Sequence, residues 1–313
     1  MTRAVVFAYH NVGVRCLDVL LAAGVEVALV VTHDDDPNEE IWFESVAARA
    51  RRAGIPVITP EDPNRSDAVA CVRAAAPDIL FSFYYRRMLG SELLGLPRLG
   101  AWNIHGSLLP KYRGRAPVNW AILHGERETG ATLHEMVAKP DAGRVVDRER
   151  VTIGPNDVAR EVFDRVTMAA VRVLERSLPA LLAGHAKLEP QDLSAGSYFG
   201  GRRPEDGAID PAWPAQRVHD LVRAVAPPYP GAFCFVAGRK LRLLRTFNAG
   251  TRDAVVGRPA LLARGPELQL RCADGGVLRV LAAELDGVAL DADLLRHRFG
   301  ADSVPLPEGL FAA

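Results

Sequence analysis

Apolar and polar positions alternate along the first hundred residues with two different periods. Short apolar runs predict buried strands at residues 3–9, 25–32, 55–58 and 78–83. Between them, apolar residues at helical spacing predict helices at 12–23, 45–53 and 68–76. Strands that alternate with helices predict a parallel sheet whose two faces are covered. Ligands of such sheets bind beyond the carboxyl ends of the strands.

The character of the chain changes near residue 200. Residues 197–214 (SYFGGRRPEDGAIDPAWP) are rich in Gly, Pro and charge, which is typical of a linker or a binding loop. A helical pattern at 216–225 follows. After it, apolar runs separated by Gly turns predict a small β-barrel or sandwich, with strands at 233–236, 240–245, 268–272 and 277–281. We therefore expect two domains, residues 1–203 and 204–313.

Composition narrows the possible classes. Of 313 residues, 49% are hydrophobic and 24% charged, as in an ordinary globular protein. Lys and Arg number 38 and so do Asp and Glu, so no global basic field attracts nucleic acid. No run reaches the roughly 18 apolar residues of a membrane span, and the first run is too short for a signal peptide. We expect a cytoplasmic protein without membrane insertion.

The cysteines, Cys16, Cys71, Cys234 and Cys272, lie far apart and form no metal-binding spacing. We expect no metal site and no disulfide frame. The pattern favours small buried side chains in a reducing compartment.

The densest polar cluster is the segment 101–117, AWNIHGSLLPKYRGRAP, which begins as a strand and opens into a loop. Asn103 and His105 are two residues apart, so both side chains point to one face of a strand. An amide N–H can stabilise the oxyanion of an acyl transfer, and an imidazole can carry the proton. Asp141, in a loop at 138–143, could orient that imidazole and raise its basicity. The alternatives are local backbone partners for Asn103 and His105 and a turn role for Asp141.

These residues resemble a known signature. Asn103, His105, the GSLLP that follows, and Asp141 are similar to the motif of the 10-formyltetrahydrofolate-dependent formyltransferases. The similarity extends over nearly the whole chain, through FSFYYRRML, KYRGRAPVNW, GATLHEM, FGGRRPEDGAID and RAVAPPYPGAF. Over these segments the chain most resembles the formyltransferase half of the bifunctional polymyxin-resistance protein. The resemblance implies a Rossmann-like, mostly parallel α/β domain followed by a small OB-like β-barrel.

The resemblance also implies roles for individual residues. Asn103 stabilises the transition state, His105 shuttles the proton, and Asp141 makes the histidine more basic. The co-substrate 10-formyltetrahydrofolate is held by residues of three segments: Arg87, Met88, Leu89, Arg115, Val137, Ala138, Lys139 and Pro140. Met88 and Leu89 could instead be packing residues at the end of a strand. Backbone groups can bind a pterin whatever the side chains are, so a methionine at position 88 is compatible with a folate site.

For the acceptor, the resemblance implies the 4-amino group of UDP-4-amino-4-deoxy-L-arabinose, formylated for lipid A modification. A separate decarboxylating dehydrogenase is then expected in the same pathway. Arg202 and Arg203 suit a diphosphate, and Tyr229 could line the acceptor cleft, although a charged linker and a packing turn explain them equally well.

Three alternatives remain open. One is a formyltransferase acting on a dTDP-4-amino-4,6-dideoxyhexose. Another is methionyl-tRNA formyltransferase, which is disfavoured because residues 34–40 are acidic and residues 206–313 hold 13 Arg and Lys against 12 Asp and Glu. The third is a non-catalytic folate- or nucleotide-binding module.

Overall fold

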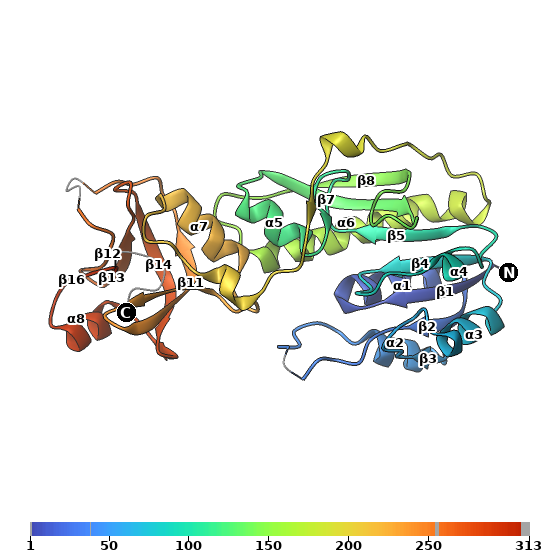
Figure 1. Cartoon of the computed structure of the whole chain (residues 1–313), viewed down its shortest axis with the longest axis horizontal. Coiled ribbons are helices and arrows are strands. Elements are labelled where there is room, and N and C mark those ends of the chain that lie inside the picture. The colour runs from blue at the N-terminus through green and yellow to red at the C-terminus, as the bar shows by residue number, and fades with distance from the viewer. Residues whose placement is uncertain (1, 38, 254–256, 308–313) are drawn as a thin grey trace. The chain divides into compact units, whose positions relative to one another are not determined.

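The computed structural model describes residues 2–37, 39–253 and 257–307, which fold into two compact units (Figure 1). Unit 1 comprises Met1–Pro117, Glu128–Thr152 and Asp164–Gly200. Unit 2 comprises Val118–Arg127, Ile153–Phe163 and Gly201–Ala313. Each unit therefore collects separate stretches of the chain, and the single boundary expected after residue 203 stays a prediction.

Unit 1 is built on one mostly parallel sheet, as the alternating pattern predicts. Its strands are β1 (Arg3–Ala8), β2 (Glu26–Val31), β3 (Val57–Ile58), β4 (Ile79–Phe83), β5 (Ala101–His105), β7 (Glu128–Glu135) and β8 (Val145–Thr152). They lie in the order β3-β2-β1-β4-β5-β7-β8 (Figure 1). The first five strands in this order are parallel. The strand β7 is antiparallel to both of its neighbours, β5 and β8. The predicted α/β class is confirmed.

The helices of unit 1 cover this sheet. They are α1 (His10–Ala22), α2 (Val46–Arg52), α3 (Ser66–Ala74), α4 (Ser91–Leu94) and most of α6 (Ala159–Leu182). The predicted start at Ser45 is explained by its hydroxyl, which caps α2 by accepting the Ala48 N–H at 3.2 Å. Along α6, Arg172 and Arg176 bind the carboxylates that β8 presents.

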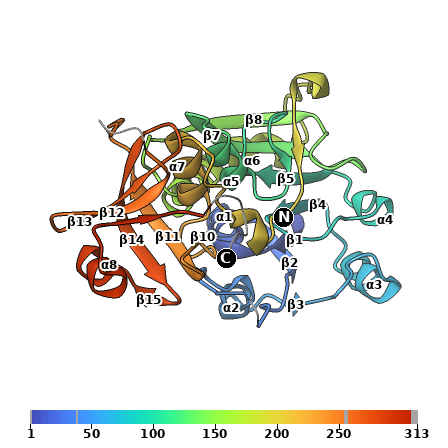
Figure 2. The ribbon, with the colours of Figure 1, turned by 60° about the vertical axis from the view of Figure 1, so that its left-hand side comes forward.

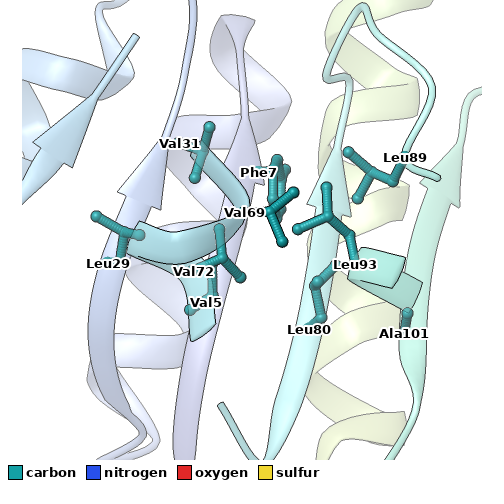
Figure 3. Close-up of a cluster of buried hydrophobic side chains, with 10 residues drawn as sticks. All are labelled: Val5, Phe7, Leu29, Val31, Val69, Val72, Leu80, Leu89, Leu93 and Ala101. Carbon is teal, nitrogen blue, oxygen red and sulfur yellow. The ribbon is translucent and has the colours of Figure 1, made fainter. Parts of the chain in front are cut away.

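A buried apolar cluster joins one face of the sheet to α3 and α4 (Figure 3). Its members come from β1, β2, β4, β5, the two helices and the loop after β4: Val5, Phe7, Leu29, Val31, Val69, Val72, Leu80, Leu89, Leu93 and Ala101. Alternate residues of β1 reach this face because side chains alternate across a strand. The cluster anchors β4 and β5 to these helices through Leu80 and Ala101, and it also holds Leu89 in the loop that follows β4.

Unit 2 is dominated by an antiparallel sheet that curls into an open half-barrel (Figure 2). The strands are β10 (Ala232–Val236), β11 (Arg239–Phe247), β12 (Ala260–Arg264), β13 (Glu267–Arg271), β14 (Val277–Leu285), β15 (Val288–Ala289) and β16 (Ser303–Pro305). The helices are α5 (Pro117–Leu123), α7 (Ala215–Ala224) and α8 (Ala292–Phe299). The predicted β-rich second part is confirmed.

Buried polar groups hold α7 in unit 2. His219 is fully buried and its ring nitrogens contact the Thr246 hydroxyl at 2.8 Å and the Pro155 carbonyl at 3.0 Å. Arg223 and Asp220 form a buried ion pair at 2.7 Å. His219, Asp220 and Arg223 thus all have partners, which buried imidazoles and charges require.

The segment 197–214 is more structured than a plain linker. It contains β9 (Tyr198–Phe199), which pairs with β6 (Arg113–Gly114), and a 3₁₀ turn at Pro204–Gly207. The expectation that all cysteines are buried is wrong for one: Cys16, Cys234 and Cys272 are buried, whereas Cys71 is exposed, because it lies on the outer side of α3. Among the described residues, no helix has both the length and the apolar character needed to cross a membrane.

Candidate active site

The candidate active site lies at the carboxyl end of β5, between β4 and β7. Asn103 and His105 occupy alternate positions of β5, and the antiparallel neighbour β7 places His134 opposite Asn103 and Thr132 opposite His105. His105, Thr132 and His134 are all buried. Polar side chains from two adjacent strands therefore lie side by side on one face of the sheet, and three of the four are buried.

His105 has a defined partner on each side of its ring. Its Nε2 lies 2.7 Å from the Tyr112 carbonyl, so this nitrogen carries the proton and donates. Its Nδ1 faces the Asp141 carboxylate, with 3.7 Å between Nδ1 and Oδ1. In the neutral ring Nδ1 is then the unprotonated nitrogen. If Nδ1 accepts a proton, the Asp141 carboxylate stabilises the positive charge of the ring.

Asp141 is held where that charge is useful. Its Oδ2 accepts the Gly114 N–H at 2.8 Å, and its Oδ1 lies 3.5 Å from His134 Nε2. Burial by itself raises the pKa of Asp141, but the Gly114 N–H and the imidazoles of His105 and His134, when they carry a proton on the nitrogen that faces Asp141, hold it well below the usual range. Asp141 is therefore a buried carboxylate that stays ionised.

Asn103 is oriented by His134. The Nδ1 of His134 lies 2.9 Å from the Glu135 carbonyl, to which it donates. In the neutral tautomer that this bond selects, Nε2 is an acceptor, and it receives the Asn103 amide N–H at 3.0 Å. One N–H of the amide group is used in this way, and the second remains as a donor for a ligand.

The turn after β5 keeps Tyr112 beside His105. The Ser107 hydroxyl donates to the Lys111 carbonyl at 2.6 Å, and the Thr132 hydroxyl donates to the Ser107 carbonyl at 2.6 Å. Gly106 is required here, because a Cβ at this position would lie 1.9 Å from the Tyr84 hydroxyl oxygen. The GSLLP motif is thus a compact turn that brings a backbone carbonyl to the imidazole.

The structure separates the three residues expected after β4. Arg87 is exposed, and the Met88 side chain is 51% exposed. Leu89 is only 3% exposed and packs in the apolar cluster of Figure 3. The side chain of Leu89 is a core residue, so any contact of this residue with a pterin would come from its backbone.

Positive charge gathers between β2, β4 and the turn after β5. Arg115 donates to the Arg86 carbonyl at 2.9 Å, and the Arg86 N–H donates to His33 Nε2 at 3.0 Å. Burial lowers the pKa of His33 to about 4, and the charges of Arg86, Arg87 and Arg115 add to this effect. The predicted folate residues Arg87 and Arg115 thus act on the same imidazole from two loops.

The loop between β7 and β8 carries the other predicted folate residues. Val137, Ala138 and Lys139 are exposed and Pro140 is half-buried. Only Asp141, the next residue, turns its side chain toward His105 and His134. The backbone of 137–140 is therefore open to a ligand beside a fixed carboxylate.

The residues expected for the acceptor belong to unit 2. Arg202 stacks over the Trp120 ring at 4.7 Å and donates to the Asp206 carbonyl at 2.8 Å, and burial lowers its pKa. Arg203 is exposed, and its backbone N–H donates to the Asp206 carboxylate at 2.7 Å. Tyr229 follows α7 in a tight turn and is half-buried.

The predicted catalytic residues come together, and two of their partners were not expected. His134 orients Asn103 and Thr132 holds the turn after β5, and neither role was expected from the sequence. The signal was available: in the strand ATLHEM, polar residues stand at alternate positions in an apolar setting, which marks one polar face. Tyr112 and Gly114 act through backbone atoms, so no side-chain pattern could reveal them.

The arrangement provides a donor, a base and a fixed negative charge in one buried space. These are the groups that an acyl transfer to an amine needs. Among residues 2–37, 39–253 and 257–307, His, Cys, Asp and Glu side chains form no group of three that could hold a metal ion.

Comparison with protein families identifies two matching models. The model described as formyl transferase matches residues 5–178, and the model described as formyl transferase, C-terminal domain, matches residues 202–294. Asn103, His105 and Asp141 lie within the first match.

Solved structures with the same fold include several transferases. WlaRD, described as a sugar 3N-formyl transferase in the presence of dTDP and 5-N-formyl-THF, aligns with a TM-score of 0.70 and 19% identity over 91% of this chain and 98% of its own. The N-formyltransferase from Helicobacter canadensis, in complex with folinic acid and dTDP-3-aminofucose, aligns with a TM-score of 0.69 and 18% identity over 90% of this chain and 99% of its own. HypX from Aquifex aeolicus, in complex with tetrahydrofolic acid, aligns with a TM-score of 0.64 and 18% identity over 99% of this chain and 52% of its own.

Proposed function

Because this chain belongs to the formyl transferase family, we propose that it transfers the formyl group of 10-formyltetrahydrofolate to the amine of a nucleotide-linked amino sugar. The observation that carries the proposal is the convergence of Asn103, His105 and Asp141 at the carboxyl end of β5. Solved structures with this fold bind formylated folates and dTDP or a dTDP-sugar.

The proposed reaction is a direct transfer. The neutral amine attacks the formyl carbon, and the second N–H of Asn103 donates to the oxyanion that forms. His105 takes the proton that the amine loses, and Asp141 and the Tyr112 carbonyl stabilise the resulting imidazolium. The bond from the formyl carbon to N10 of the folate then breaks, and N10 receives the proton that the His105 imidazolium gives up. No covalent intermediate with the enzyme forms.

The folate is proposed to lie along the loops that flank this site. Arg87 and Arg115 supply positive charge for the glutamyl carboxylates of the co-substrate. Backbone groups of 87–89 and 137–140 offer donors and acceptors for the pterin. Leu89 supports this loop from the core, and the exposed Met88 leaves its backbone accessible.

For the acceptor we propose UDP-4-amino-4-deoxy-L-arabinose. This acceptor would place the enzyme in lipid A modification and polymyxin resistance. A separate decarboxylating dehydrogenase would then act in the same pathway. The support is the resemblance of the GRAPVNW and FGGRRPEDG segments to those of the polymyxin-resistance formyltransferases. Arg202 and Arg203 are the cations proposed for its diphosphate, and Tyr229 is proposed to line the acceptor cleft.

A second candidate acceptor is a dTDP-linked amino sugar, such as a dTDP-4-amino-4,6-dideoxyhexose. It is favoured by the ligands of the solved structures, WlaRD with dTDP and the Helicobacter canadensis enzyme with dTDP-3-aminofucose. Transfer to a tRNA is disfavoured, because the loop after β2 presents Asp34, Asp35 and Asp36 to solvent, and these would repel phosphates.

One experiment separates these acceptors. Release of tetrahydrofolate from 10-formyltetrahydrofolate is followed with UDP-4-amino-4-deoxy-L-arabinose, a dTDP-4-amino sugar and charged initiator tRNA offered in parallel. We expect turnover with the UDP-pentose and little with the others. Turnover with the dTDP-sugar alone keeps the mechanism and replaces the acceptor. Absence of turnover with all of them, while folate still binds, favours a non-catalytic binding module.

A further inference from the structure

The two ring partners of His105 lie on different loops, and one later segment of the chain contacts both loops. This segment, residues 189–199, is called the clamp. It begins at Glu189, which exchanges backbone hydrogen bonds of 2.7 and 2.8 Å with Val145 at the start of β8. It ends in β9, which pairs with β6. The clamp therefore spans from the Asp141 loop to the loop of Tyr112.

Gln191 holds the Asp141 side of the site. Its Nε2 donates to the Asp141 carbonyl at 3.0 Å and to the Gly143 carbonyl at 2.5 Å. Asp141 has a φ of 51°, in the left-handed region that few side chains adopt. A side chain that fixes the carbonyls of Asp141 and Gly143 thus stabilises a backbone turn that is unfavourable by itself, and with it the direction of the carboxylate.

Ser197 holds the Tyr112 side of the site. Its hydroxyl accepts the Tyr112 N–H at 2.8 Å, and its carbonyl accepts the Arg113 N–H at 3.0 Å. The next residues of the clamp, Tyr198 and Phe199, pair with Arg113 and Gly114. Gly114 is also the residue whose N–H binds Asp141 Oδ2. The clamp therefore fixes the peptide that accepts the His105 proton and the one that binds Asp141.

The clamp passes too close to the site to be a loose surface loop. A Cβ on Gly196 would lie 2.4 Å from the Pro110 carbonyl oxygen, and a Cβ on Gly114 would lie 2.1 Å from the Phe199 carbonyl oxygen. At both positions only a glycine leaves room for the neighbouring backbone.

We propose that Gln191 and Ser197 are positioning residues, which act through Asp141 and Tyr112 to set the orientation and hydrogen bonding of His105. The proposal rests on the proposed function, in which His105 carries the proton. Neither side chain touches the reacting atoms. Their contribution is to keep a base and its two partners in one geometry, and small losses of alignment reduce rate steeply.

The test compares Gln191→Leu and Ser197→Ala with the wild type in steady-state formyl transfer. We expect kcat to fall roughly ten- to a hundredfold in each variant, while KM for both substrates changes less than kcat. The acid limb of the kcat/KM profile should move to lower pH in Gln191→Leu, because a displaced Asp141 stabilises the imidazolium less. Ser197→Thr keeps the hydroxyl and should restore most of the activity.

Matched controls exist on the chain. Gln269 is also half-buried and donates to Glu267 at 2.9 Å, and Ser194 lies in the clamp but binds only Asp192. Gln269→Leu and Ser194→Ala should keep wild-type kcat. Wild-type kcat and pH profile in both Gln191→Leu and Ser197→Ala would overturn the proposal, as would equal losses in the controls.

A second readout does not need the acceptor. In ¹⁵N-imidazole NMR, the Nε2 proton of His105 should exchange with water faster in Gln191→Leu and Ser197→Ala than in the wild type, because its bond to the Tyr112 carbonyl is less well held. Unchanged exchange in both variants would contradict the clamp. Wild-type protein that transfers no formyl group to any acceptor would contradict the proposed function instead, and the exchange measurement would still decide on the clamp.

Discussion

At the scale of single residues, the site depends on which nitrogen of each histidine carries the proton. His105 and His134 both donate to a backbone carbonyl, His105 through Nε2 and His134 through Nδ1. Each bond leaves the other ring nitrogen as a base, one facing Asp141 and one facing Asn103. The same side-chain type therefore presents a base toward Asp141 on β5 and an acceptor toward Asn103 on β7.

The role of Asn103 leads to the first prediction. Asn103→Ala removes the amide donor and should lower kcat by about 10²–10³-fold, the effect of losing one oxyanion donor. The measurement is kcat for formyl transfer at saturating substrates. Asn248→Ala is the control, since Asn248 is a half-buried amide in unit 2 that donates to Gln216. A kcat within a fewfold of wild type for Asn103→Ala would show that the oxyanion is stabilised elsewhere.

Neighbouring residues Met88 and Leu89 supply the second prediction. Leu89→Ala empties a position that is 3% exposed in the apolar cluster and should lower the free energy of unfolding by about 2–5 kcal/mol. Met88→Ala removes a side chain that is 51% exposed and should change it by less than about 0.5 kcal/mol.

Urea denaturation followed by circular dichroism measures both variants. If Met88→Ala were as destabilising as Leu89→Ala, the assignment of Leu89 to the core and Met88 to the surface would be wrong.

At the scale of elements, the loop that follows β2 is tied to the loop that follows β4. Arg86 forms two hydrogen bonds of 2.6 Å with the Glu39 carboxylate, and the Tyr9 hydroxyl donates to Asp35 at 2.8 Å. His33 stacks on Tyr85, with ring centroids 4.1 Å apart. The acidic loop is therefore anchored to the strand ends that the folate is proposed to approach.

His33 makes this junction sensitive to pH, which is the third prediction. Its pKa is about 4 in the folded chain, against an ordinary value of 6.5. Between these values the unfolded chain binds more protons than the folded one, so stability should fall as the pH falls from 6.5 to 4. His33→Gln keeps an acceptor but cannot be protonated, so it should lose less stability over this interval.

Urea denaturation of both proteins at pH 7 and pH 4.5 measures the difference. Equal losses in the wild type and in His33→Gln would show that His33 is not the group responsible.

The sequence predicts long, regular elements well and short pairings poorly. The strands β1 to β4, the helices α1 to α3 and α7 follow from the apolar pattern, because the strands are short apolar runs and the apolar residues of the helices recur at helical spacing. The four-residue helix α4 was not predicted, because it is too short to form such a pattern. The pairing of β6 with β9 involves two residues on each strand, too few to form a pattern. The contact of Gln191 with the Asp141 loop is likewise invisible in the sequence, because it joins a side chain to carbonyls 50 residues away.

At the scale of the whole chain, domain organisation is less linear than a change in composition suggests. Residues 118–127 and 153–163 belong to unit 2, although unit 1 precedes and follows each of them in the sequence. The Gly- and Pro-rich segment near 200 can indicate only one boundary, so it cannot show that earlier segments of the chain also belong to the second unit. The candidate catalytic residues, by contrast, could be predicted from the sequence, because the side chains of Asn103, His105 and Asp141 carry the proposed chemistry themselves. Asn103 and His105 lie on β5, and Asp141 lies in the loop between β7 and β8.

The central claim is that the group at the end of β5 performs formyl transfer, and activity of His105→Ala and Asp141→Asn tests it most directly. Each variant is assayed for tetrahydrofolate release with 10-formyltetrahydrofolate and the acceptor that the wild type uses. Folate binding is measured on the same protein. We expect each variant to bind folate and to lose at least about a hundredfold in kcat. Near-wild-type turnover in either variant would contradict the account.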